Sequence, residues 1–135
     1  KDFLVWGQDA SKACKIIENP GRCGESGATY IKSLKKYMLI AWYYNENGRD
    51  KPSDSTFIVY LADHPWGDWK IIETKQNIPE GWYSPRVVAK FEKVCNDGSI
   101  HIAICTGGDY TTGFGTGTVD YYKMTMLPLK IEIKE

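Results

Sequence analysis

Short runs rich in Ile, Val, Tyr, Thr and Phe recur along the whole chain, each bounded by polar or glycine-containing breaks. No window shows the 3.6-residue periodicity of an amphipathic helix, so the pattern predicts an all-β fold. We expect ten strands, at residues 3–6, 14–18, 28–33, 36–44, 55–62, 69–74, 85–94, 99–106, 118–126 and 129–134.

A repeat relates the start of the chain to its middle. The segment LVWGQDASKACKIIE (4–18) aligns without a gap with VYLADHPWGDWKIIE (59–73), and the two KIIE tetrapeptides superimpose. Four expected strands span 28–74, and four more span 85–134. Four-stranded antiparallel units that repeat in this way are typical of β-propeller blades.

This repeat predicts about two and a half blades: an outer half-blade at 1–18, a blade at 19–74 and a second blade at 75–135. Such a chain cannot close a ring alone, and its open sheet edges need a partner. We therefore expect either further blades in a longer propeller or association of several copies. A sandwich of two packed sheets would explain the strands but not the repeat.

Long connections alternate with tight turns, such as the hairpin turn expected at Asn96-Asp97-Gly98. Successive strands of a meander reverse direction, so all the long connections should fall at one end of the sheets. Functional residues concentrate on long loops over a rigid scaffold, which makes this end the expected site. The long connections are 19–27, 45–54, 75–84 and 107–117.

Charge and cysteine content narrow the function classes. The 17 basic residues balance the 17 acidic ones, so nucleic acid and an anionic membrane are not expected partners. Cys14 and Cys23 would pair if the protein were secreted, whereas Cys95 and Cys105 are typical of small buried hydrophobic residues. No apolar run is long enough to span a membrane, and KDFLVW at the start lacks the features of a signal peptide.

No cofactor or metal is expected. The cysteines form no CxxC pair, and His64 and His101 have no carboxylate at ligand spacing. The GFGTGT stretch (113–118) contains no lysine and precedes an expected strand, unlike a phosphate-binding loop. The tryptophans of PWGDW, Trp66 and Trp69, are interpreted as structural residues that cap an outer turn.

Several segments together resemble a known group of proteins. ESGATYIKSLKKYMLIAWYY, FIVYLADHPWGDWKII, GWYSPRVVAKF and GSIHIAICTGG, followed by YYKMTMLPLKIEI, are similar to consecutive blades of the five-bladed propellers related to glycoside hydrolases. That group includes arabinanase, xylosidase and fructosidase families. The resemblance covers nearly the whole chain, with Asp68 in PWGDW where proline is common.

The resemblance implies a carbohydrate ligand and a candidate general acid. In those enzymes three carboxylates surround an axial pocket, and the acid is a glutamate just before an inner strand. Glu25, which precedes SGATYI, matches that position, although Ser26 and Gly27 depart from the family pattern. Glycoside cleavage also needs a second carboxyl group about 5–10 Å from the acid. The resemblance implies that the aspartates that supply it would lie in earlier blades. Glu25 is otherwise interpreted as a solvated turn residue.

Six further residues are candidates for contacting a sugar: Arg22, Trp82, Tyr83, Arg86, Asp109 and Tyr110. Aromatic side chains stack on the C–H faces of sugar rings, and guanidinium groups offer fixed forks of hydrogen-bond donors. Packing between blades, or a place on the solvated surface, is the alternative for each. The sequence thus predicts a propeller segment that binds or hydrolyses a glycan. A non-catalytic carbohydrate-binding or scaffold module is the alternative, and a β-sandwich binding domain comes third.

Overall fold

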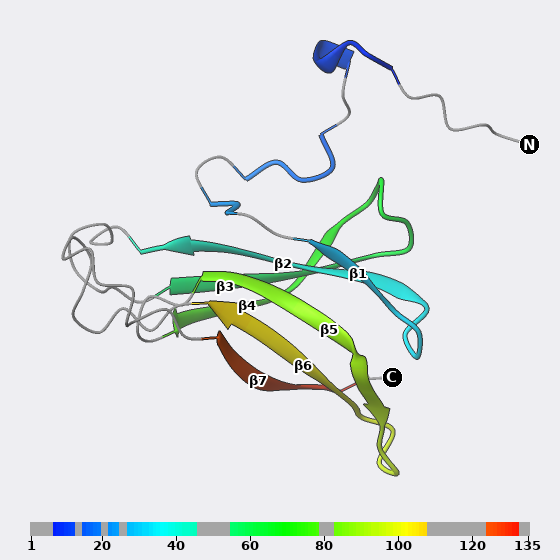
Figure 1. Ribbon diagram of the computed structural model, residues 1–135. Helices are drawn as coiled ribbons and strands as arrows, with labels where there is room; N and C mark the ends of the chain where they lie inside the picture. Colours follow the sequence, from blue (N-terminus) through cyan, green and yellow to red (C-terminus); the bar gives the residue numbers. More distant parts are fainter. Residues whose placement is uncertain are drawn as a thin grey trace, which may run out of the picture.

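The computed structural model describes residues 7–12, 15–19, 22–24, 27–45, 55–78, 83–107 and 124–132. In this part of the chain every regular element except one 3-10 turn, η1, is a strand, which confirms the all-β prediction. The strands form two antiparallel sheets, β1–β2–β3–β4 and β5–β6–β7, packed against one another (Figure 1). The element bounds are η1 (Ala10–Lys12), β1 (Ala28–Ile31), β2 (Lys36–Tyr44), β3 (Ser55–Ala62), β4 (Lys70–Ile78), β5 (Tyr83–Val94), β6 (Ile100–Gly107) and β7 (Met124–Ile131).

The burial of the side chains in each strand matches the position of that strand in its sheet. In β6, Ile100, Ile102 and Ile104 are buried and alternate with more exposed residues, as expected of a strand with one face in the core. β2 and β3 are instead apolar on both faces, because the four-stranded sheet is covered on both sides. The largest part of the core lies between the sheets and contains Ile31, Met38, Ile40, Phe57, Val59, Val87, Ile102 and Ile104.

The first strands of the two sheets lie side by side. β5 packs against β1 and β2, and the Thr29 hydroxyl donates a hydrogen bond to the Val87 carbonyl oxygen over 3.4 Å. Farther along, the Glu92 carboxylate accepts the backbone N–H groups of Lys32 (3.1 Å) and Ser33 (2.6 Å) from the β1–β2 turn. Side-chain contacts therefore join the sheets at this edge, whereas a cleft separates β4 from β7 at the other.

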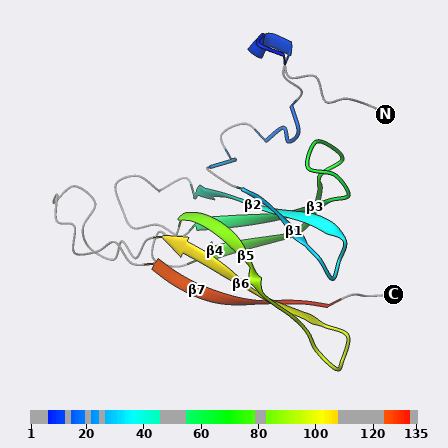
Figure 2. The same cartoon turned by 45° about the vertical axis from the view of Figure 1, so that its right-hand side comes forward.

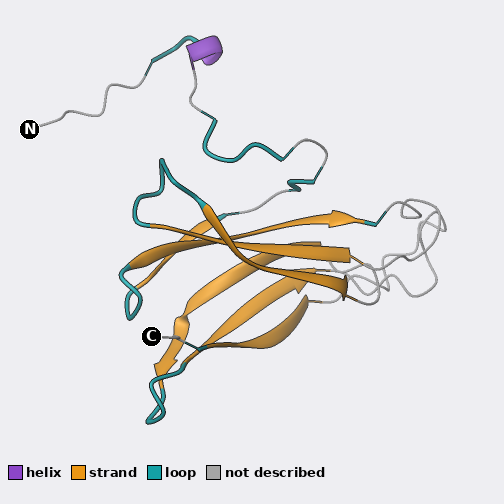
Figure 3. Cartoon of the chain, turned by 180° about the vertical axis from the view of Figure 1, so that it is seen from behind, coloured by secondary structure: helices purple, strands orange, loops and turns teal. Residues whose placement is uncertain are grey.

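The segment before β1 covers the outer face of the four-stranded sheet (Figure 3). Ile17 packs against a second apolar cluster that includes Leu39, Ile58 and Tyr60, and the Asn19 amide donates a hydrogen bond to the Tyr60 hydroxyl over 3.3 Å. Residues 15–19 form no strand. The strand expected at 14–18 is thus wrong for its described residues, because Ile17 is partly buried by a side-chain contact and not held by strand pairing.

That correction also removes the equivalence of the two KIIE tetrapeptides. The second one opens β4, while the first lies in irregular chain. The expected strand at 3–6 and the start of the one at 118–126 lie outside the described residues. Residues 124–126 of that expected strand and the strand expected at 129–134 belong to one observed strand, β7. Pro128 is tolerated inside β7 because, among the described strands, β7 pairs only with β6.

The strands place the long connections at one end of the sheets, as expected, but the connection expected at 75–84 is shorter, because β4 continues to Ile78 and β5 begins at Tyr83. This end of the sheets, which we call the loop end, carries the long connections (Figure 2). The strands that begin there are β1, β3, β5 and β7, and the strands that end there are β2, β4 and β6. The opposite end, the turn end, carries the short hairpin turns at 32–35 and 95–99. Gly98 in the second turn has a φ of 79°, which suits glycine.

Candidate functional site

An aromatic cluster bridges the two sheets at the loop end. Trp42 and Tyr44 stand two residues apart on β2, so both face the three-stranded sheet. Their rings meet edge to face with centroids 5.0 Å apart, and the Tyr83 ring of β5 lies 5.7 Å from that of Trp42. We call Trp42, Tyr44 and Tyr83 the loop-end aromatic cluster. All three side chains are only partly buried, so aromatic surface remains exposed where a ligand can stack.

Backbone and hydroxyl contacts fix the position of Tyr83. The buried Thr106 hydroxyl donates a hydrogen bond to the Tyr83 carbonyl oxygen over 2.8 Å, and a Cβ atom on Gly107 would lie 3.2 Å from the Tyr83 ring. The next residue, Ser84, has a φ of 48°, a conformation that costs energy for a residue other than glycine. The start of β5 is therefore held in a strained conformation, and such strain often accompanies functional sites.

Two glycines bring the preceding segment onto this cluster. The Gly24 N–H donates a hydrogen bond to the Trp42 carbonyl oxygen over 2.8 Å, and a Cβ atom on Gly24 would lie 2.5 Å from the indole ring. A Cβ atom on Gly27 would collide with the Arg86 guanidinium group. Gly24 and Gly27 therefore both lie at the loop end, and they are the sequence neighbours of Glu25 and Ser26.

Arg22 lies on the other side of the sheet from Tyr83. Its guanidinium carbon stands 5.3 Å from the centroid of the Tyr43 ring, on the outer face. The structure therefore brings Tyr83 to the same side as Trp42, places Arg86 beside Gly27, and separates Arg22 from Tyr83. The remaining predicted site residues, Glu25, Trp82, Asp109 and Tyr110, lie outside the described residues.

Trp42 and Tyr44 were not predicted as site residues, and Tyr83 was expected in a loop but lies at the start of β5. A signal for the first two was available. Met38, Ile40, Trp42 and Tyr44 alternate along one face of β2, and the two aromatic residues come last, next to a long polar connection. Alternation of this kind predicts an aromatic patch at the loop end of an otherwise aliphatic face.

Among the described residues, the carboxyl groups with clearly shifted pKa values lie away from the loop end. Hydrogen bonds from Ser99 and then Lys130 lower the pKa of Asp97 to about 2, and a hydrogen bond from Lys36 lowers the pKa of Asp63. The pKa values of Asp9 and Glu92 are lowered as well. A general acid for glycoside cleavage needs a raised pKa, so none of these four carboxyl groups fits that role.

The described residues give no sign of a metal site or a membrane span. They contain no group of three or more His, Cys, Asp or Glu side chains that could hold an ion. No helix among them is long and apolar enough to cross a bilayer. Cys23 is an exposed free thiol, and Cys95 and Cys105 are half-buried free thiols.

No family model, no curated protein and no solved structure matches the chain. The functional interpretation therefore depends on the loop-end residues themselves.

Proposed function

We propose that this chain is a carbohydrate-binding segment of a β-propeller and that it binds glycan at the loop end. The loop-end aromatic cluster is the observation that carries the proposal. Partly exposed rings from two sheets, held by glycine contacts, offer apolar faces on which sugar rings stack. Arg86, beside Gly27, supplies a fork of donors for sugar hydroxyl groups.

The arrangement of the sheets supports the propeller part of this proposal. Each sheet is a meander in which neighbouring strands are consecutive in the chain, and the first strands, β1 and β5, lie together. Blades at 19–74 and 75–135 would pack in this way around an axis next to β1 and β5. The ring is completed either by more blades of a longer chain or by further copies, and sedimentation of the protein distinguishes the two.

Titration calorimetry with arabino-, xylo- and fructo-oligosaccharides tests the binding proposal. Tyr83→Ala should weaken binding of the recognised sugar about fivefold, because one stacked ring contributes roughly 1 kcal/mol. Tyr30→Ala is the matched control, since Tyr30 also pairs with an aromatic neighbour, Tyr37, but near the turn end. The proposal is wrong if no oligosaccharide binds, or if both variants bind like the unchanged protein.

Hydrolysis is the second candidate function, because both neighbours of the Glu25–Ser26 dipeptide pack at the loop end. The family resemblance makes Glu25 the general acid of that reaction. Release of reducing sugar from arabinan by the full chain, abolished in Glu25→Gln while binding is retained, would support it. Sugar release that is unchanged in Glu25→Gln would remove Glu25 from the catalytic role.

A further inference from the structure

The two tryptophans of PWGDW have different surroundings. Both belong to the connection between β3 and β4, residues 63–69, which lies at the turn end and projects beyond the four-stranded sheet (Figures 1 and 3). Trp69 packs against the outer apolar cluster that includes Leu39 and Tyr60, as a structural residue does. Trp66 is instead 59% exposed. Its ring therefore contributes little to the core and is available to a ligand.

A tight turn fixes the backbone at Trp66. The Gly67 N–H donates a hydrogen bond to the His64 carbonyl oxygen over 3.4 Å, and these two residues form a β-bridge. Pro65 and Trp66 are the central residues of this turn, and proline is favoured at the first central position because its ring fixes φ. Asp68 follows with a φ of 50°, which costs energy for a residue other than glycine. The turn thus holds Trp66 in place with some strain at Asp68.

The His64 ring fixes the orientation of the Trp66 indole. The centroids of the two rings lie 5.4 Å apart, and the ring planes differ by only 3°, which is an offset-stacked arrangement. His64 lies against one face of the indole, and the large exposed fraction shows that the other face is open to solvent. Single exposed apolar side chains are common. A ring that is held by a stacked neighbour and a tight turn is also preorganised, so a ligand that packs on it loses little binding energy to ordering.

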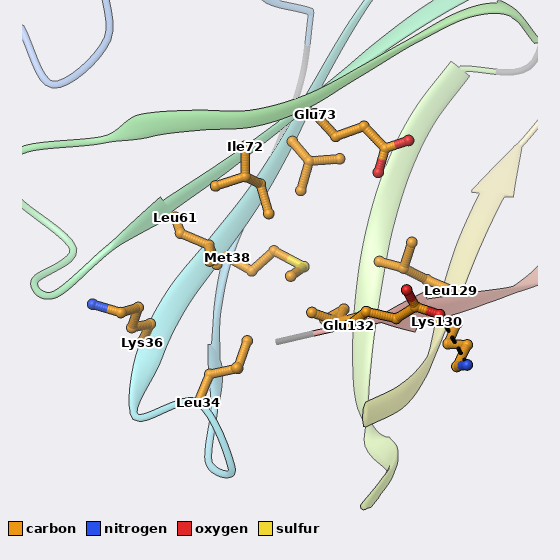
Figure 4. Close-up of a pocket in the computed structure, with 11 residues that line it drawn as sticks. Leu34, Lys36, Met38, Leu61, Ile72, Glu73, Leu129, Lys130 and Glu132 are labelled. Carbon is orange, nitrogen blue, oxygen red and sulfur yellow. Dashed lines mark ion pairs between the residues drawn. The ribbon is translucent and has the colours of Figure 1, made fainter. Parts of the chain in front are cut away.

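Polar groups lie next to this aromatic pair. Asp63 precedes His64, and its carboxylate, 72% exposed, accepts a hydrogen bond from the Lys36 ammonium group over 2.6 Å. That hydrogen bond lowers the pKa of Asp63, so the carboxylate is charged at neutral pH. Lys36 also lines the cleft between β4 and β7, but its ammonium group points away from the cleft (Figure 4). An exposed acceptor and an exposed donor are therefore available near the rings.

We propose that Trp66 and His64 form a second glycan-binding platform, at the turn end, that takes a neutral pyranose chain. The C–H face of a pyranose ring packs on the open indole face, and its hydroxyl groups bind the Asp63 carboxylate and the Lys36 ammonium group. Asp63 and Asp68 repel phosphate-bearing ligands by their charge. Quaternary ammonium ligands prefer a cage of several rings, whereas a single flat platform suits a sugar ring.

The platform shares no residue with the loop-end aromatic cluster. Trp42 of that cluster pairs with Phe57 near the start of β3, whereas His64 follows the end of β3. A strand of 8 residues spans roughly 26 Å, so the two sites are well separated. One chain therefore binds glycan at two points, and avidity strengthens its binding to a polysaccharide.

Nuclear magnetic resonance of the Trp66 indole N–H group tests the proposal in the full chain. The protein carries isotope-labelled tryptophan, the probe is xylohexaose, and the Trp66→Ala variant identifies the signal. Xylohexaose should shift the Trp66 signal in the unchanged protein and equally in Tyr83→Ala, because Tyr83 lies at the loop end.

Calorimetry in the Tyr83→Ala background measures the affinity of the platform. Adding Trp66→Ala should weaken the residual xylohexaose binding about fivefold, whereas Trp66→Tyr, which keeps a flat ring, should retain most of it. Phe91→Ala is the matched control, because Phe91 is similarly exposed, at 56%, but lies on β5. This variant should bind like the background protein.

Two results would overturn the proposal. One is a Trp66 signal that does not move at millimolar xylohexaose. The other is a shift with tetramethylammonium chloride but none with xylohexaose, which would assign the platform to cations. Failure of the loop-end proposal is seen instead as a Tyr83→Ala variant that binds like the unchanged protein, so the two failures are distinguishable.

Discussion

The Glu92 carboxylate is the clearest single target for a stability measurement, because it ties the β1–β2 turn to β5. It accepts two backbone N–H groups, from Lys32 and Ser33, over 3.1 and 2.6 Å. Hydrogen bonds to a charged group contribute about 1.5–3 kcal/mol when well shielded. Because this carboxylate is partly exposed to solvent, we take about 2 kcal/mol for the pair together. The Glu92→Ala variant should lose that amount of unfolding free energy.

Urea unfolding followed by tryptophan fluorescence measures this loss. Glu92→Gln keeps one good acceptor oxygen, so it should lose about half as much, roughly 1 kcal/mol. Glu18→Ala is the control, since Glu18 forms only an exposed ion pair with Lys15 over 3.2 Å, and such pairs contribute about 0–1 kcal/mol. The reasoning fails if Glu92→Ala is no less stable than Glu18→Ala.

The pH dependence of the Glu92 effect has a defined sign. Burial acts to raise the pKa of this carboxyl group, but hydrogen bonds from Ser33 and Lys32 outweigh it and hold the pKa below the ordinary 4.5. A depressed pKa in the folded state means that the stabilisation is complete above pH 4.5 and declines as the pH falls through the folded value. The difference between the unchanged protein and Glu92→Gln should therefore shrink as the pH falls below 4.5.

Two further predictions concern other parts of the fold. Gly24→Ala should destabilise the protein by about 1–3 kcal/mol and weaken glycan binding, because its Cβ atom would meet the Trp42 ring at 2.5 Å and the Trp42 carbonyl oxygen at 2.9 Å. Gly67→Ala, whose Cβ atom would meet nothing within 4 Å, is the control, and equal melting temperatures for the two variants would contradict the prediction. Asp97→Asn should lower the melting temperature at pH 6. The difference should fade between pH 3.8 and pH 2, because hydrogen bonds from Ser99 depress the pKa of Asp97 from 3.8 to about 2. A difference that stays constant down to pH 2 would show that this carboxylate does not stabilise the turn by its charge.

The sequence predicted the strands that form hairpins with clear boundaries. β2 and β3 were placed at their observed limits, because each is a long apolar run bounded by polar residues. The break expected at Leu127-Pro128 was wrong because proline ends a strand only where its N–H is needed, and an edge strand does not need every donor. Pairing partners, which decide whether a strand is an edge, cannot be read from local sequence.

Candidate site residues were harder to predict than strands. Alternation within β5 gave no indication that Tyr83 would reach across to Trp42 of another sheet, since that contact depends on how the sheets pack. Arg22 and Arg86 were predicted as the same kind of hydrogen-bond donor, but Arg22 lies over the Tyr43 ring and Arg86 lies beside Gly27, which depends on packing and not on local sequence. Composition identified the right residue types, whereas the packing of the sheets decided which of them meet.

The meander order of both sheets has a consequence for how the protein folds. Every strand ladder in the described chain joins strands that are consecutive in sequence, so each sheet can form by adding one hairpin at a time with little loop-closure entropy. Docking of the two sheets brings distant residues into one core, such as Met38 of β2 and Ile102 and Ile104 of β6. We therefore expect the sheets to form first and their association to limit the folding rate, with core substitutions at Ile102 or Ile104 slowing that step.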